Sequence, residues 1–179
     1  MNERAIAIEC SLKLNPMWKD KKEDLPWGEI ENRPYLRALN ERAIALYDTR
    51  RLEEAIKQAK YLIKLNPSDN QGTRQLLISW YLEIGNTEGC SNLLRKYADC
   101  TDAYLAYADI LLQFLLWKKD DAVEDGVKKA LFVAIQQNTF IPQLITSSDD
   151  IKEVKHECIT PGAINEAESY VDYSRRLWK

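Results

Sequence analysis

The single histidine of the chain, His156, lies two residues before Cys158 in the sequence KHEC. Such a pair supplies half of a thiol site or half of a metal site. A zinc site needs four protein ligands, or three ligands and a water. The other cysteines, Cys10, Cys90 and Cys100, have no paired spacing. We therefore expect His156 to be a solvated loop residue, and we expect no metal site, no cofactor and no catalytic residues.

Other catalytic patterns are missing from the sequence. It contains no phosphate-binding loop, no GxGxxG and no GxSxG. Asp149 and Asp150 lack the spaced ligands and the glycine of a calcium loop. The sequence therefore favours a protein that is not an enzyme.

The composition is that of an ordinary globular protein, with 45% apolar and 30% charged residues. The net charge of −3 gives no basic face for nucleic acid and no polybasic membrane anchor. No apolar stretch is long enough to cross a bilayer, and the N-terminus lacks the apolar core of a signal peptide. The four widely spaced cysteines are expected to be buried or half-buried free thiols in a reducing compartment. We expect a cytoplasmic protein.

Apolar residues recur at three and four positions along most of the chain, whereas no stretch alternates with a period of two. The fold class is therefore expected to be all-α. Helices are predicted over residues 3–14, 34–49, 52–65, 70–84, 87–97, 102–118, 120–137 and 163–177, and residues 138–162 are expected to be irregular. The last helix is expected to cap the fold, with Glu166, Glu168, Asp172, Arg175 and Arg176 facing outward.

A sharp stop separates two of these helices at the sequence LNPSDNQG, residues 65–72. Pro67 cannot continue a helix and disfavours helix at Asn66. Ser68, Asp69 and Asn70 offer oxygens that can cap the next helix. The helix therefore ends so that the next one can turn back and stack on it.

The helix pairs repeat. Ala55 and Gly89 are 34 residues apart, each directly follows a glutamate, and each is a small residue where two helices are expected to cross. This spacing resembles the tetratricopeptide-repeat (TPR) superfamily, and the best-matching unit is 36–69. The resemblance implies a right-handed α-solenoid of about three helix-turn-helix repeats, in which stacked neighbours complete one apolar core.

The segments RPYLRAL, NPSDNQGTRQLL and LLRKY together resemble a narrower TPR-like family that carries NPxDNQG and is related to the suppression-of-tumorigenicity proteins. The whole chain, 1–179, is expected to be a single helical-repeat domain, either on its own or as the C-terminal piece of a longer array. Its expected parts are an N-terminal helix and loop (1–35), the best repeat (36–69), a second repeat (70–103), a degenerate third repeat (104–142), and an irregular segment with the capping helix (143–179).

The resemblance implies a concave face that binds a protein partner, as an extended peptide or a helix. It places on this face Arg37, Asn40, Ile44, Tyr47, Gln71, Arg74, Ile78 and Tyr81. Arginines can grip a carboxylate, and tyrosines offer flat contact area. The alternative for these residues is that they face only solvent or each other.

The chaperone-binding TPR clamp holds a carboxylate with a fixed Lys/Asn/Asn/Lys/Arg set. The chain instead has Asn40, Ile44, Gln75, Leu105 and Asp109 at the matching positions, which argues against binding of chaperone tails. The alternative function is a structural or assembly domain that self-associates into a homo-oligomer or belongs to a larger protein.

Overall fold

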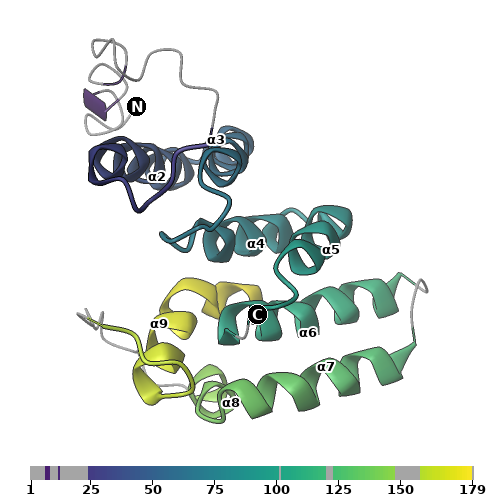
Figure 1. Ribbon diagram of the computed structural model, residues 1–179. Coiled ribbons are helices and arrows are strands. Elements are labelled where there is room, and N and C mark those ends of the chain that lie inside the picture. Colours follow the sequence, from purple (N-terminus) through teal and green to yellow (C-terminus); the bar gives the residue numbers. More distant parts are fainter. Residues whose placement is uncertain are drawn as a thin grey trace. The chain divides into compact units, whose positions relative to one another are not determined.

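The computed structural model describes residues 7–8, 12, 24–100, 102–119, 123–147 and 158–178, and within them every regular element is helical (Figure 1). The elements are η1 (Ile30–Asn32), α2 (Arg33–Asp48), α3 (Leu52–Leu65), α4 (Thr73–Glu83), α5 (Thr87–Lys96), α6 (Ala103–Lys118), α7 (Glu124–Gln137), α8 (Ile141–Thr146), α9 (Ile164–Ser174) and η2 (Arg175–Trp178). The all-α prediction is confirmed. Most of the predicted helix 3–14 lies outside the described residues.

Two stretches differ from the sequence-based expectation. α4 begins at Thr73 and not at residue 70, because Asp69 and Gly72 have positive φ angles of 47° and 71° and cannot belong to a helix. The stretch 138–162, which the sequence predicts to be irregular, contains α8. Pro142 lies in the first turn of α8, where proline favours the start of a helix.

The stop between α3 and α4 is built around Asp69, which is buried. Its carboxylate accepts hydrogen bonds from the backbone N–H groups of Thr73 at 2.8 Å and Arg74 at 2.9 Å. The guanidinium of Arg74 lies 3.1 Å from the same carboxylate. Of the three expected capping residues, Asp69 therefore caps α4.

Replacing Asp69 with alanine is expected to lower the free energy of unfolding by about 2 kcal/mol, since the change removes a helix cap and forces a Cβ-bearing apolar residue into a left-handed backbone position. Asp69→Asn is the matched control. It keeps one capping oxygen and tolerates the backbone, so its loss should be about half as large. Urea unfolding followed by circular dichroism measures both. Equal losses would contradict the assigned role of the cap.

Contacts group the chain into two units, Met1–Trp80 (unit 1) and Tyr81–Lys179 (unit 2), and the division lies within α4. The single-domain assignment stays a prediction. The helices α2, α4 and α6 end at Asp48, Glu83 and Lys118, at intervals of 35 residues.

In unit 1, α2 and α3 pack side by side over a core of leucines (Figure 1). α4 contacts α2 at two places, one at its first residue and one in its second half. The hydroxyl of Thr73 donates to Oδ1 of Asn40 at 3.2 Å, and the ring of Trp80 stacks on Tyr47 at 5.1 Å. Both contacts join residues 33 positions apart. α2 and α4 therefore run parallel where they contact each other.

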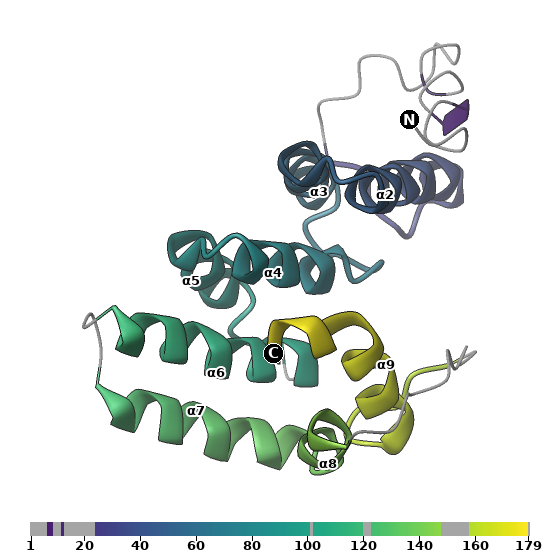
Figure 2. The same cartoon turned by 180° about the vertical axis from the view of Figure 1, so that it is seen from behind.

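In unit 2, α6 and α7 are the longest pair, and both views show them side by side (Figures 1 and 2). Tyr107 of α6 donates a hydrogen bond of 2.7 Å to the backbone oxygen of Asn138, directly after α7. Near the other end of the pair, a Cβ on Gly126 would lie 3.0 Å from Oε1 of Gln113. The pair is therefore antiparallel.

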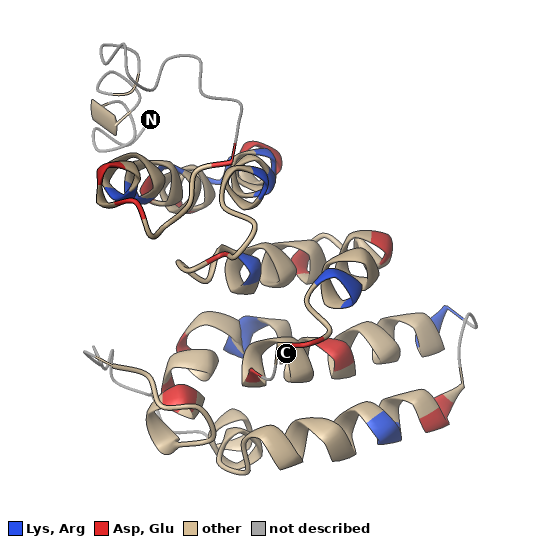
Figure 3. Ribbon diagram, viewed as in Figure 1, with Lys and Arg blue, Asp and Glu red and all other residues tan. Residues whose placement is uncertain are grey.

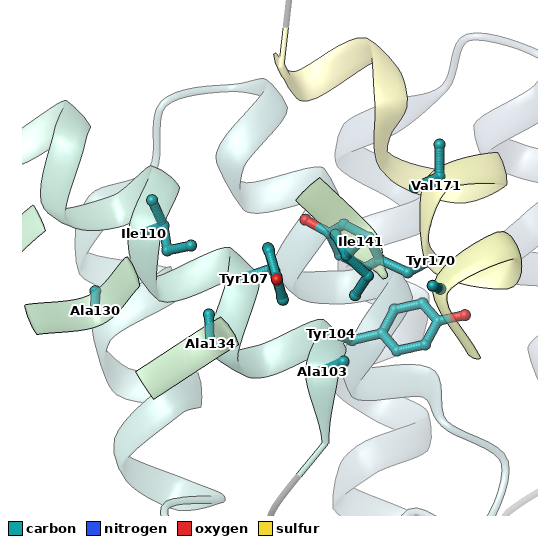
Figure 4. Close-up of a cluster of buried hydrophobic side chains, with 10 residues drawn as sticks. Ala103, Tyr104, Tyr107, Ile110, Ala130, Ala134, Ile141, Tyr170 and Val171 are labelled. Carbon is teal, nitrogen blue, oxygen red and sulfur yellow. The ribbon is translucent and has the colours of Figure 1, made fainter. Parts of the chain in front are cut away.

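α9 closes the core of unit 2 through an aromatic cluster, shown in Figure 4. The ring of Tyr170 lies 5.4 Å from the rings of both Tyr104 and Tyr107. The hydroxyl of Tyr104 bonds to Ser169, and the indole of Trp178 donates to the hydroxyl of Tyr170. Burial raises the pKa of Tyr104 and of Tyr107 to about 12, so both phenols are neutral at physiological pH.

Glu166 of α9 is buried, which corrects the expectation that it faces outward. One carboxylate oxygen accepts the backbone N–H of Ala103 at 3.3 Å. The other accepts the backbone N–H of Gly162 at 2.7 Å and the side-chain amide of Asn138 at 3.0 Å. A single carboxylate therefore joins α9 to the start of α6 and to the end of α7.

The two repeat-related small residues are both required by packing. Ala55 is fully buried. A Cβ on Gly89 would lie 3.0 Å from two ring atoms of Tyr81, which is closer than Cβ atoms normally approach their neighbours. Of the cysteines, Cys90 is buried, as expected, whereas Cys100 and Cys158 are exposed, which corrects the expectation for those two.

Candidate functional site

The eight residues predicted to bind a partner are not equally accessible. Arg37 is exposed, and Ile78 and Tyr81 are buried. The remaining five are half-buried: Asn40, Ile44, Tyr47, Gln71 and Arg74. Seven of the eight belong to unit 1 and Tyr81 belongs to unit 2.

Several of these side chains are engaged within the protein. Arg74 pairs with Asp69, and burial, the largest influence, raises the pKa of that carboxyl although Arg74 opposes the shift. Tyr47 stacks on Trp80, and Asn40 accepts from Thr73. The contacts of Tyr47 and Asn40 hold α4 against α2, and the pair of Arg74 with Asp69 holds the start of α4, which leaves these groups less available to grip a peptide.

Arg37 is the exposed cation of this set, and it lies beside an aromatic ring. Its guanidinium carbon is 5.5 Å from the ring centre of Trp27, and that of Arg33 is 5.3 Å from the same ring. Arg33 also donates from Nε to the backbone oxygen of Trp27 at 2.9 Å. The structure therefore brings Arg37 together with Trp27 and Arg33, which the sequence analysis did not group with it.

A second surface, which the sequence analysis did not identify, lies on α7 and the turn that follows it. We call it the α7 face. Its side chains are between 38% and 66% exposed: Leu131, Phe132, Ile135 and Phe140. Residues 130–147 contain no charged residue, and Figure 3 shows the second half of α7 and all of α8 without a charged position.

On α7, small residues are buried and large apolar residues are exposed, which is the reverse of what a helix facing water usually shows. The buried side chains are the small Ala130 and Ala134, whereas large apolar side chains point outward. Leu131 and Ile135 lie one turn apart on the same side, and Phe132 adjoins them. A water-facing helix usually buries its large apolar residues and exposes polar ones.

The sequence analysis predicted this helix over 120–137 and did not identify its exposed apolar residues. Leu131 is 42% exposed, and Val123, directly before α7, is 71% exposed. Two signals in the sequence could have revealed the exposed face: the absence of charge over 130–147, and the unbroken run of large apolar residues between Ala130 and Ala134.

The candidate thiol or metal pair, His156 and Cys158, lies only partly within the described residues. Cys158 is exposed, and His156 lies outside the described residues. In the part of the chain that the structure describes, no three His, Cys, Asp or Glu side chains gather as a metal site would require. None of the helices described there has the length and apolar character needed to span a membrane.

The chain matches no known family model, no curated protein and no solved structure.

Proposed function

We propose that this protein is a non-catalytic interaction module that binds a helix of a partner protein on the α7 face. The observation that carries the proposal is the exposure of Leu131, Phe132 and Ile135 on an uncharged part of α7. Contiguous exposed apolar patches mark interaction sites on soluble proteins.

The chemistry of the α7 face fits a protein partner. The centres of protein interfaces are depleted in charge and enriched in aromatic residues. Phe132 is 66% exposed and supplies an aromatic anchor, and Leu131 and Ile135 flank it. An amphipathic partner helix with apolar residues at positions i, i+3, i+4 and i+7 matches such a stripe.

A repeat architecture supports this type of function. The 35-residue spacing of the ends of α2, α4 and α6 fits a helix-turn-helix repeat, and so does the parallel contact of α2 with α4 in unit 1. In the TPR-like solenoid that we propose, helix pairs stack in series and offer long faces to a partner. The wide spacing of the cysteines supports a cytoplasmic location.

The concave face remains a second candidate surface for the same function. Of its predicted residues, Ile44 and Gln71 are not engaged in the contacts described above, and Arg37 is exposed beside the ring of Trp27. Oε1 of Gln71 is buried without a hydrogen-bond donor. Such an acceptor gains from a donor supplied by a bound peptide. Self-association through the α7 face is the alternative to a different partner.

The test compares three forms of the chain as baits in a cell lysate. The first is the wild type, and the second carries Leu131→Ser, Phe132→Ser and Ile135→Ser. The third carries Arg37→Glu and Ile44→Ser on the concave face. The partner recovered with the wild type is then purified, and its affinity for each form is measured by calorimetry. The proposal expects the α7-face variant to lose at least about thirtyfold in affinity, the effect of removing an interface anchor.

Retention of the partner by the α7-face variant would reject the α7 face as the binding surface. Loss only from the concave-face variant would move the site to α2. Since the substituted residues of α7 are exposed, unchanged circular dichroism is expected for that variant. Light scattering of the wild type tests for self-association through the α7 face. If the wild type self-associates through this face, the same three substitutions should abolish the association.

A further inference from the structure

A cavity of about 410 Å³ lies within unit 2. Eight side chains line it, all of them apolar, from α4, α6, α7 and η2. They include Ile110, Leu111 and Phe114 of α6, Val127 of α7, and Leu177 and Trp178 of η2. Phe114 both lines the cavity and is 40% exposed, and we therefore take the cavity to open to solvent beside this residue.

Its volume and lining are those of a small-molecule site. Ligand pockets usually have volumes of about 300–1,000 Å³ and mostly apolar walls, with a few polar groups that orient the ligand. The α7 face is formed by the outer side of one helix, whereas this cavity is enclosed by several elements. It therefore suits a compact apolar group better than it suits a second helix.

A cation lies beside the open end. The ammonium of Lys118 is 5.5 Å from the ring centre of Phe114 and 5.5 Å from that of Trp117. Because Phe114 lines the cavity, an anionic group at its mouth would lie close to this ammonium. Arg176 is adjacent in sequence to the lining residue Leu177, and it is paired with Glu83 at 3.3 Å. Among the described contacts, Lys118 therefore supplies the accessible positive charge beside the residues that line the cavity.

We propose that this cavity binds one molecule of a single-chain carboxylate amphiphile. The hydrocarbon chain would lie against Leu111, Val127 and Trp178, and the carboxylate would lie near Lys118. Burial of the chain supplies the affinity, because apolar surface leaves water. Lys118 supplies the preference for an anionic head group. This site is separate from the proposed helix-binding face and does not depend on it.

The test titrates the full chain with dodecanoate below its critical micelle concentration, and with the uncharged analogue dodecanol, by isothermal calorimetry. Lys118→Met should weaken dodecanoate binding about two- to fivefold, as expected for a solvent-exposed ion pair, and should leave dodecanol binding unchanged. Lys119→Met is the matched control, because it removes the same charge one residue away. It should change the affinity for either ligand by less than about twofold.

The cavity itself is tested by filling it from either wall, with Leu111→Trp or with Val127→Phe. Each variant that retains the wild-type circular dichroism should lose at least about tenfold in affinity for both ligands. Saturable dodecanoate binding with these losses supports the proposal. No saturable binding to the wild type, equal effects of the two lysine variants, or full binding by both filled variants would overturn it. Binding only to phosphatidylserine-containing vesicles would also overturn it, since the amphiphile would then be recognised as part of a membrane.

Discussion

Glu166→Ala should lower the free energy of unfolding by about 3 kcal/mol, because three hydrogen-bond donors converge on this one carboxylate. The donors are the backbone N–H groups of Ala103 and Gly162 and the side-chain amide of Asn138. Leaving a buried donor unsatisfied costs about 1–3 kcal/mol, and part of this cost is offset by removal of a buried charge.

Glu166→Gln sharpens the prediction. Glutamine has nearly the same shape, but one end of its amide is itself a donor. Since all three partners donate, glutamine must place a donor against a donor, and we expect it to recover only part of the loss. Asp172→Ala, which removes an exposed carboxylate from the same helix, should change stability by less than about 0.5 kcal/mol. Urea unfolding followed by circular dichroism measures all three. Full stability of Glu166→Gln would show that the charge of Glu166 is not needed.

Trp80→Ala should cost about 3–5 kcal/mol, the usual cost of removing a buried aromatic side chain. Trp80 is 2% exposed, and its ring lies 5.1 Å from that of Tyr47 with an angle of 10° between the planes. The change leaves a cavity and removes the stacking contact between α4 and α2.

A double-mutant cycle isolates the stacking contribution. Trp80→Leu, Tyr47→Leu and the double variant are compared by urea unfolding. A direct aromatic pair should give a coupling energy of about 1 kcal/mol. Strictly additive losses would mean that the two rings contribute independently and that the stack does not hold α4 against α2.

The positions of the helices could be predicted because local signals end them. Pro67 stops α3, and the left-handed Gly85 lies two residues after the end of α4. The stretch 138–162 was predicted to be irregular, yet Pro142 lies in the first turn of α8, since proline is compatible with the first turn of a helix as well as with its end. The same residue type therefore supports two opposite predictions, and neighbouring contacts decide between them.

The accessibility of side chains could be predicted less well. The resemblance to the TPR superfamily placed Ile78 and Tyr81 on a binding face, but both are buried. The sequence analysis expected Glu166 to face outward, although its carboxylate is satisfied by groups 63 and 28 residues away in the sequence. Helical periodicity shows which residues share a face, but not which neighbour covers that face.

By itself the sequence determined the all-helical class, most helix ends and the small residues at Ala55 and Gly89, since each depends on local backbone preferences or on a short repeat. Only the tertiary structure decided that Asp69 and Arg74 satisfy each other and that the large side chains of α7 face outward. It also decided that an apolar cavity opens beside Lys118. These features depend on which distant segments pack together, and burial, charge pairing and cavity shape follow from that packing and not from the order of residues along one helix.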